Sequence, residues 1–173
     1  EYALNPSQTL TLAHFHLDQN DLSRWHNTIH NPGWTQGSSF TTAGTDLSRD
    51  YDQERSLTYL RFEETNANSS WIDRYQATIS FQRTQDSEFR VRESGRSDTR
   101  ILDIDTFGLS LVAGTGETVW GADYFHDQID SQGFRNSTPR PSNRPIADDS
   151  TYESIGIFTN YTHETYGASH FAV

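Results

Sequence analysis

The sequence contains no cysteine, no lysine and no long apolar segment, and each absence excludes a class of protein. With 0 Cys, the chain has neither a disulfide framework nor a thiolate for catalysis. All 13 basic residues are arginine, and the 24 acidic residues bring the formal charge to -11. An acidic chain is a poor nucleic-acid binder, so we expect no nucleic-acid partner. No segment approaches the ~18–20 consecutive apolar residues of a membrane helix.

The polarity of the chain does not indicate disorder. The mean hydropathy is -0.80 and only 32% of the residues are hydrophobic. The chain nevertheless contains 4 Trp, 8 Tyr and 10 Phe, whereas disordered chains are poor in aromatic residues. Aromatic residues favour strands, and the length of 173 residues suits one domain. Low hydropathy also does not exclude membrane strands, because one of their faces is polar.

Residues 71–82 show the clearest pattern. From Arg74 onward apolar and polar residues alternate, which predicts a β-strand with two different faces. We expect the apolar residues to lie on a convex face, which carries Tyr75, Ala77, Ile79 and Phe81 together with Phe107, Leu109 and Leu111. The polar residues should lie on the concave face, which carries Gln76, Thr78 and Ser80 together with Thr106, Gly108 and Ser110. Such an apolar face either covers the core of a soluble sheet or meets lipid in a transmembrane strand.

Strands are predicted along the whole chain, at residues 1–4, 9–17, 54–64, 71–82, 100–112, 117–126 and 151–162, and one more begins at 168–173. In the second of these, the apolar face is either Leu10 with Leu12, or Ala13 with Phe15 and Leu17.

The predicted connections alternate between short and long. The short ones are residues 5–8, 65–69, 113–116 and 164–167, and the long polar ones are 18–52, 84–99 and 127–149. In an up-and-down meander, alternate connections lie at opposite ends, so one end would carry tight turns and the other long loops. Transmembrane β-barrels have this asymmetry. We therefore predict an all-β fold, an antiparallel up-and-down meander of six or seven strands that forms part of a transmembrane β-barrel wall, with no helix of note.

Four segments stand at or near the ends of the predicted strands: residues 24–29 (RWHNTI), 52–60 (DQERSLTYL), 124–131 (YFHDQIDS) and 146–158 (IADDSTYESIGIF). Together they resemble TonB-dependent outer-membrane receptors of the siderophore and haem type. The resemblance implies a bacterial outer-membrane location, contact with outer-membrane lipid, and import of an iron-siderophore, haem or similar nutrient powered by the TonB complex. An N-terminal TonB box, a plug domain and a terminal closing strand are not recognisable. Residues 1–173 are therefore predicted to be a partial barrel, and transport is expected of the parent protein.

The longest predicted loop carries the candidate ligand-binding residues Trp25, His26, His30 and Trp34. Aromatic rings and imidazoles on an outer loop suit haem or a ferric chelate as the ligand. The alternative is that these side chains pack the loop or lie in the aromatic belt at the membrane interface. We expect no catalytic residue, no resident metal and no cofactor.

Three other groups have weaker functional interpretations. His14 and His16 share a strand face at chelating spacing, but no third ligand is apparent and a polar lumen face explains them better. The paired Asp103 and Asp105 suit acid–base chemistry, but charged lumen residues are routine in barrels. Arginines at positions 90, 92, 96 and 100 suit an anionic chelate or lipopolysaccharide phosphates; a solvated loop paired with nearby carboxylates is the simpler interpretation.

The competing hypothesis is a soluble, secreted β-sandwich of the carbohydrate-binding type. Trp34, Trp71 and Trp120 would then serve as stacking platforms. The two hypotheses differ in what covers the apolar strand faces: a second sheet in the sandwich, and lipid in the barrel.

Overall fold

The computed structural model describes residues 1–24, 28, 32–33, 42–67 and 71–162 of the chain. Its main strands are β1 (Tyr2–Asn5), β2 (Gln8–Ser23), β5 (Asp46–Glu64), β6 (Arg74–Arg92), β7 (Ser97–Thr115), β8 (Thr118–Arg135) and β10 (Ser150–Tyr161). The smaller elements are β3 (Pro32–Gly33), β4 (Thr42–Ala43), β9 (Thr138–Pro139) and the 3-10 turn η1 (Pro141–Asn143).

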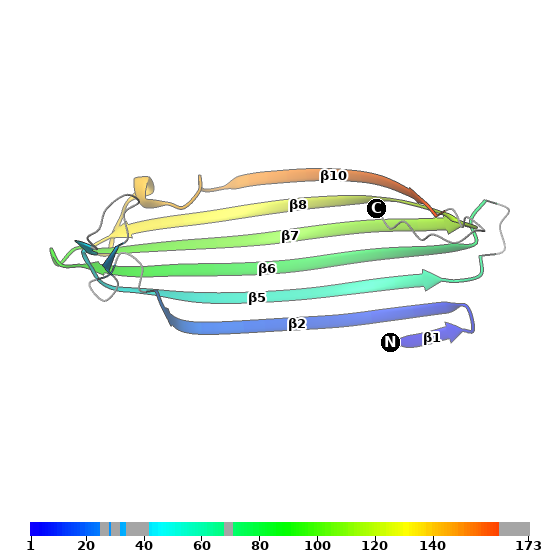
Figure 1. Cartoon of the computed structure of the whole chain (residues 1–173), viewed down its shortest axis with the longest axis horizontal. Coiled ribbons are helices and arrows are strands. Elements are labelled where there is room, and N and C mark those ends of the chain that lie inside the picture. Colours follow the sequence, from blue (N-terminus) through cyan, green and yellow to red (C-terminus); the bar gives the residue numbers. More distant parts are fainter. Residues whose placement is uncertain (25–27, 29–31, 34–41, 68–70, 163–173) are drawn as a thin grey trace, which may run out of the picture.

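The main strands form one antiparallel sheet in the order β1-β2-β5-β6-β7-β8-β10, and β9 adds to β8 (Figure 1). Neighbours in the sheet follow one another along the chain, apart from the small strands. The predicted up-and-down meander is thus confirmed. Among the described strands β1 and β2 lie at one edge and β10 at the other, so the sheet is open and not closed into a barrel.

The strands are much longer than the sequence pattern predicts. Strands β5, β6 and β7 each have 19 residues, which corresponds to roughly 60 Å at about 3.3 Å per residue. Parts of the predicted long loops are therefore strand, namely residues 18–23, 46–52, 84–92, 97–99 and 127–135. Polar residues predominate on both faces of these parts and interrupt the apolar alternation that reveals a half-buried strand. The backbone ladder continues through them nonetheless.

Alternate connections lie at opposite ends of the sheet (Figure 1). The connections after β2, β6 and β8 leave the sheet at one end, called the loop end here, with residues 24, 28, 42–45, 93–96 and 136–149 among the described residues. Those after β1, β5 and β7 leave it at the other, the turn end, with residues 6–7, 65–67, 71–73 and 116–117. The described parts of the three predicted loops do lie toward one end. The prediction of a long loop between β6 and β7 is wrong, because that connection has four residues closed by Gly95 with a φ of 77°. The predicted turn at 164–167 and strand at 168–173 lie outside the described residues.

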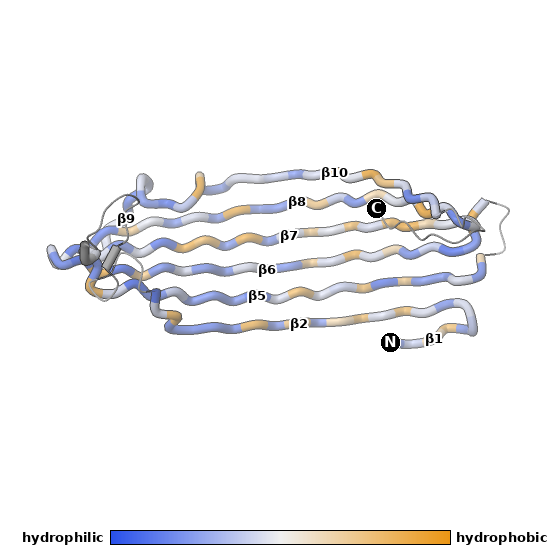
Figure 2. The backbone as a smooth tube through the Cα atoms, viewed as in Figure 1, coloured by the Kyte–Doolittle hydropathy of each residue, from blue (hydrophilic) through white to orange (hydrophobic). Residues whose placement is uncertain are grey.

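The strand register confirms the predicted partition of side chains between the two faces. Ala77 pairs with Leu111, Ile79 with Leu109 and Phe81 with Phe107, whereas Thr78 pairs with Ser110 and Ser80 with Gly108. Directly paired residues share a face. We call the face of Ile79 the apolar face and the face of Thr78 the polar face. The alternation along the strands is visible in Figure 2.

In β2 both apolar sets exist, on opposite faces. Leu12 pairs with Leu60, which pairs with Ile79, so Leu10 and Leu12 lie on the apolar face. Ala13 pairs with Tyr59, which pairs with Ser80, so Ala13, Phe15 and Leu17 lie on the polar face. The Phe15 ring stacks on Tyr59 with centroids 6.3 Å apart.

The described part of the chain has almost no hydrophobic core. Ala113 is its one buried hydrophobic residue, while Ile79, Phe81, Ile155 and Ile157 are 51%, 49%, 76% and 84% exposed. No helix in the described residues is long and apolar enough to cross a membrane. Apart from the two-residue pair of β3 and β4, no second sheet is present among the described residues. The face-packed sheets required by the sandwich hypothesis are therefore not observed there.

Two glycines on the polar face provide a matched test of the packing between strands. A Cβ atom at Gly121 would lie 2.6 Å from the Leu111 carbonyl oxygen and 2.6 Å from the Phe158 ring, whereas a Cβ at Gly156 would contact nothing within 4 Å. We expect Gly121→Val to destabilise the protein by about 1–3 kcal/mol, because overpacking forces a backbone shift. Gly156→Val should have little effect. Urea midpoints followed by tryptophan fluorescence measure both, and equal midpoints would contradict this packing.

Candidate functional site

The four residues predicted to bind ligand, Trp25, His26, His30 and Trp34, lie outside the described residues, so their role stays a prediction. Thr28, which lies between Trp25 and Trp34 in the sequence, is described and contacts the loop end. The Thr28 carbonyl accepts a hydrogen bond from the Gly44 N–H at 3.2 Å, and Thr28 bridges to Asp46 in parallel. Both Thr28 and Asp46 are 2% exposed.

The described charged groups concentrate on the polar face at this same end. We call one set the arginine patch: Arg49, Arg90, Arg92, Arg96, Arg100 and Arg135. The register brings Arg49, Arg90, Asp98 and Arg135 into one row across four strands. Strand pairing thus assembles guanidinium groups that are distant in sequence.

Asp98 is the centre of the patch. Arg96 donates to its carboxylate from Nε at 3.0 Å and from Nη2 at 2.9 Å, and Arg135 Nε donates at 3.3 Å. Arg92 Nε lies 3.5 Å from the second carboxylate oxygen. Burial alone would raise the pKa of the Asp98 carboxyl, but hydrogen bonds from Arg96, Asn143 and Arg135 outweigh it and hold the pKa below its ordinary value.

A second carboxylate, Glu88, bridges two arginines of the patch. Arg49 Nε donates to it at 2.6 Å and Arg100 Nη1 at 3.3 Å. Tyr51 lies next to this pair, with the Arg24 and Arg49 guanidinium carbons 5.0 and 5.5 Å from its ring centre. Burial and the negative charge of Glu88 raise the pKa of the Tyr51 hydroxyl above its ordinary value.

The connection after β8 folds over the arginine patch and completes it. Asn143 in η1 donates from Nδ2 to Asp98 at 2.9 Å and to the Phe134 carbonyl at 3.2 Å. Its Oδ1 accepts from Arg135 at 3.2 Å. Asp148 accepts from the backbone N–H of the fully buried Ser131 at 2.9 Å. We call residues 140–148 the cap.

The cap depends on a glycine beneath it. A Cβ atom at Gly133 would lie 2.6 Å from the Asn143 carbonyl carbon and 2.7 Å from the Arg144 nitrogen. Both are backbone atoms, so a side chain at this position would push the cap off β8.

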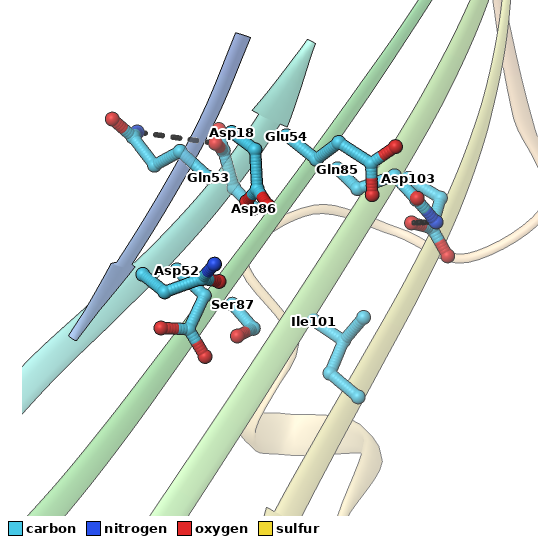
Figure 3. Close-up of a pocket in the computed structure, with 10 residues that line it drawn as sticks. Asp18, Asp52, Gln53, Glu54, Gln85, Asp86, Ser87, Ile101 and Asp103 are labelled. Carbon is cyan, nitrogen blue, oxygen red and sulfur yellow. Dashed lines mark hydrogen bonds between the residues drawn. The ribbon is translucent and has the colours of Figure 1, made fainter.

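The opposite face of the same end is acidic. A hollow of about 250 Å³ is lined by residues that include Asp18, Asp52, Glu54 and Asp103 (Figure 3). Gln85 donates to Asp103 at 2.8 Å. No group of three or more His, Cys, Asp or Glu side chains in the described part of the chain is arranged to hold a metal ion. The hollow is therefore a concentration of negative charge and not a chelating site.

Several predicted placements are wrong. His14 pairs with Thr58, which pairs with Phe81, so His14 and His16 lie on the apolar face and not on the polar lumen face expected of them. Asp103 and Asp105 also lie on the apolar face, in line with Phe107. A single residue type does not reveal its face, because the face is fixed by the register of the whole strand.

The prediction for the four arginines is confirmed in part. Those at positions 90, 92 and 100 lie on strands and Arg96 lies in the turn, and all are paired with Asp46, Asp98 or Glu88. Pairing with carboxylates is confirmed, but the solvated loop is not. Glu88, Asp98, Arg135 and Asn143 were not predicted. The signal for Glu88 was its period of two with Arg90 and Arg92, which indicates a polar strand face.

No family model, no curated protein and no solved structure matches the chain.

The cap yields one prediction. Replacing Gly133 with Ala should release residues 140–148 from the sheet, because backbone atoms occupy the space of the new Cβ. The open Gly156 gives a control on the same face, since Gly156→Ala meets nothing. Limited proteolysis should show faster cleavage between residues 136 and 149 in Gly133→Ala alone. Identical cleavage in the two variants would show that the cap does not rest on Gly133.

Asp98 yields a pH prediction. Its pKa in the folded protein is below the ordinary value of 3.8, so the stabilisation from its ion pairs is fully present above that value. The stabilisation is lost as pH falls through the lowered pKa. We expect the NMR signals of the Asn143 side-chain amide to titrate below pH 3.8 and to lose this titration in Asp98→Asn. A titration centred above that value would contradict the assignment.

Proposed function

We propose that this chain forms part of the wall of a bacterial outer-membrane β-barrel that imports a nutrient, in the manner of a TonB-dependent receptor. The observation that carries the proposal is the exposed apolar face: a wide sheet with apolar rows on one side that the described residues leave uncovered. Such a face requires a cover, because leaving apolar area in water is unfavourable by about 25 cal/mol per Å². Lipid is the cover that a single-layer wall fits.

The apolar rows have the extent of a membrane band. One row runs Leu10, Phe62, Ala77, Leu111, Ala122, Ile157 and the next runs Leu12, Leu60, Ile79, Leu109, Tyr124, Ile155. From Tyr75 to Phe81 the rows cover about 20 Å along the strand at 3.3 Å per residue, compared with roughly 25 Å for the apolar band of outer-membrane barrels. Aromatic residues lie at both limits, with Tyr75 and Trp120 at one and Phe81 and Phe107 at the other.

The opposite face suits a water-filled lumen at the same height. On β6 it carries Gln76, Thr78, Ser80 and Gln82, which pair with polar or small residues on β7 apart from Val112. A soluble sandwich, the alternative, would need a second sheet on the apolar face. The lumen and lipid assignment needs no second sheet on that face, although further strands must close the two open edges.

The ends of the sheet give the wall a direction. Outer-membrane barrels have short periplasmic turns and longer outer loops. The turn end then faces the periplasm, and the loop end, with its arginine patch and cap, faces outward, where ligand arrives. Loops held on a rigid scaffold commonly carry binding. The ligand class proposed from the resemblance is an iron chelate or haem.

The test compares two neighbouring residues on opposite faces. In the intact protein, Ile79→Arg should destabilise the folded state by about 2–4 kcal/mol, because it places a charge in lipid near the bilayer midplane. Thr78→Arg should be far milder, since its side chain meets water. Folding into outer-membrane vesicles can be followed by heat-modifiable electrophoretic mobility and urea titration.

Equal destabilisation at the two positions would refute the lipid-facing assignment. So would recovery of the intact protein from the soluble fraction of cells.

A further inference from the structure

The loop-end half of the sheet carries opposite charge on its two faces. From the row of Arg83 to the loop end, the apolar face holds one arginine and seven carboxylates: Asp18, Asp50, Asp52, Glu54, Asp103, Asp105 and Asp130. Over the same length the polar face and the 93–96 turn hold Arg55 and the six arginines of the patch, against Asp46, Asp86, Glu88, Glu93 and Asp98. In a chain with a formal charge of -11, positive charge has thus been gathered on one face.

The excess is largest around Asp98. Three guanidinium groups, those of Arg92, Arg96 and Arg135, surround this single carboxylate at 2.8 to 3.5 Å. The carboxylate compensates one of the three positive charges, which leaves a surplus of two. Each of these arginine side chains is 31% exposed, so solvent screens the surplus only in part.

Two arginines of the patch also have donors that form no well-aligned hydrogen bond. The buried Nε atoms of Arg90 and Arg92 form ion pairs, at 3.1 Å from Asp46 and 3.5 Å from Asp98, but neither contact has hydrogen-bond geometry. A purely structural ion-pair network would match its charges and align its donors. Buried donors that lack an aligned acceptor are rare in folded proteins and call for an explanation.

We propose that the arginine patch binds an anionic small molecule that carries two or more carboxylate or phosphate groups. Guanidinium forks recognise the oxygens of either group bidentately. The ligand competes with Asp98 for Arg92, Arg96 and Arg135 and is covered by the cap through Asn143. The idea that this ligand is the imported molecule rests on the proposed function. The idea that the patch binds an anion does not.

The probes for the test are citrate and inorganic pyrophosphate, titrated into the folded full chain by calorimetry at low salt. We expect Arg135→Gln to weaken the binding of at least one probe about tenfold or more, because the variant loses a charge-assisted hydrogen bond to the ligand. The matched control is Arg61→Gln, on the same face but nearer the turn end, where Arg61 lies by Thr78. It should leave the affinity unchanged.

A second variant separates ligand binding from a structural role. Asp98→Asn removes the competing carboxylate while keeping a similar shape, so it should raise affinity for the bound probe several-fold. A network that serves only folding would lose stability in this variant without gaining affinity. The phosphate and carboxylate probes, used separately, identify which oxyanion chemistry the patch prefers.

No binding of either probe to the unmodified chain would overturn the inference. Equal affinities in Arg135→Gln and Arg61→Gln would overturn it too, as would unchanged or weaker binding in Asp98→Asn. Cell fractionation tests the proposed function separately. A membrane-inserted protein that binds neither probe refutes only the anion site, whereas a soluble protein that binds a probe refutes only the barrel.

Discussion

The backbone hydrogen-bond ladder between long neighbouring strands is the interaction on which the rest of the structure depends. With Ala113 as the one buried apolar residue among those described, side-chain packing within the sheet cannot be the main source of order. Strands β5, β6, β7 and β8 instead each pair with two neighbours over much of their length. Such a ladder satisfies the backbone polar groups but leaves both faces to be covered by something else. The membrane wall proposed above would meet that requirement, with lipid on the apolar face and water on the polar face.

The buried polar groups explain why the loop end is ordered despite its polarity. Asp46, Glu88, Asp98 and Asn143 are all less than a tenth exposed, and each is held by arginines or backbone groups from other strands. Removing one partner from such a cluster leaves a charge without compensation, which is costly. The cluster therefore fixes the connection after β8 against the polar face. In effect the ion-pair network performs at this end the positioning that a hydrophobic core performs in other folds.

The two faces bear on function in different ways. The apolar face carries the argument for a membrane wall, since exposed aliphatic rows continue across six strands from β2 to β10. The polar face carries the argument for ligand capture, because it collects arginines at the end where the longer connections lie. The resemblance to TonB-dependent receptors is compatible with both. The binding role of Trp25, His26, His30 and Trp34 rests on the sequence alone.

The sequence by itself determined the class of fold, the strand order and the faces of β6 and β7. Where one face is apolar and the other polar, a period of two is visible in residues 74–82 and 106–111 without any partner strand. Beyond those segments the pattern fails, because strands that are polar on both faces look like loops until their neighbours supply the hydrogen bonds. Register decided the rest: it placed His14 and Asp103 on the apolar face and brought Arg90, Arg135 and Asp98 together. Only pairing between strands fixes such contacts, since residues 37 or more positions apart, such as Arg135 and Asp98, carry no local signal of their proximity.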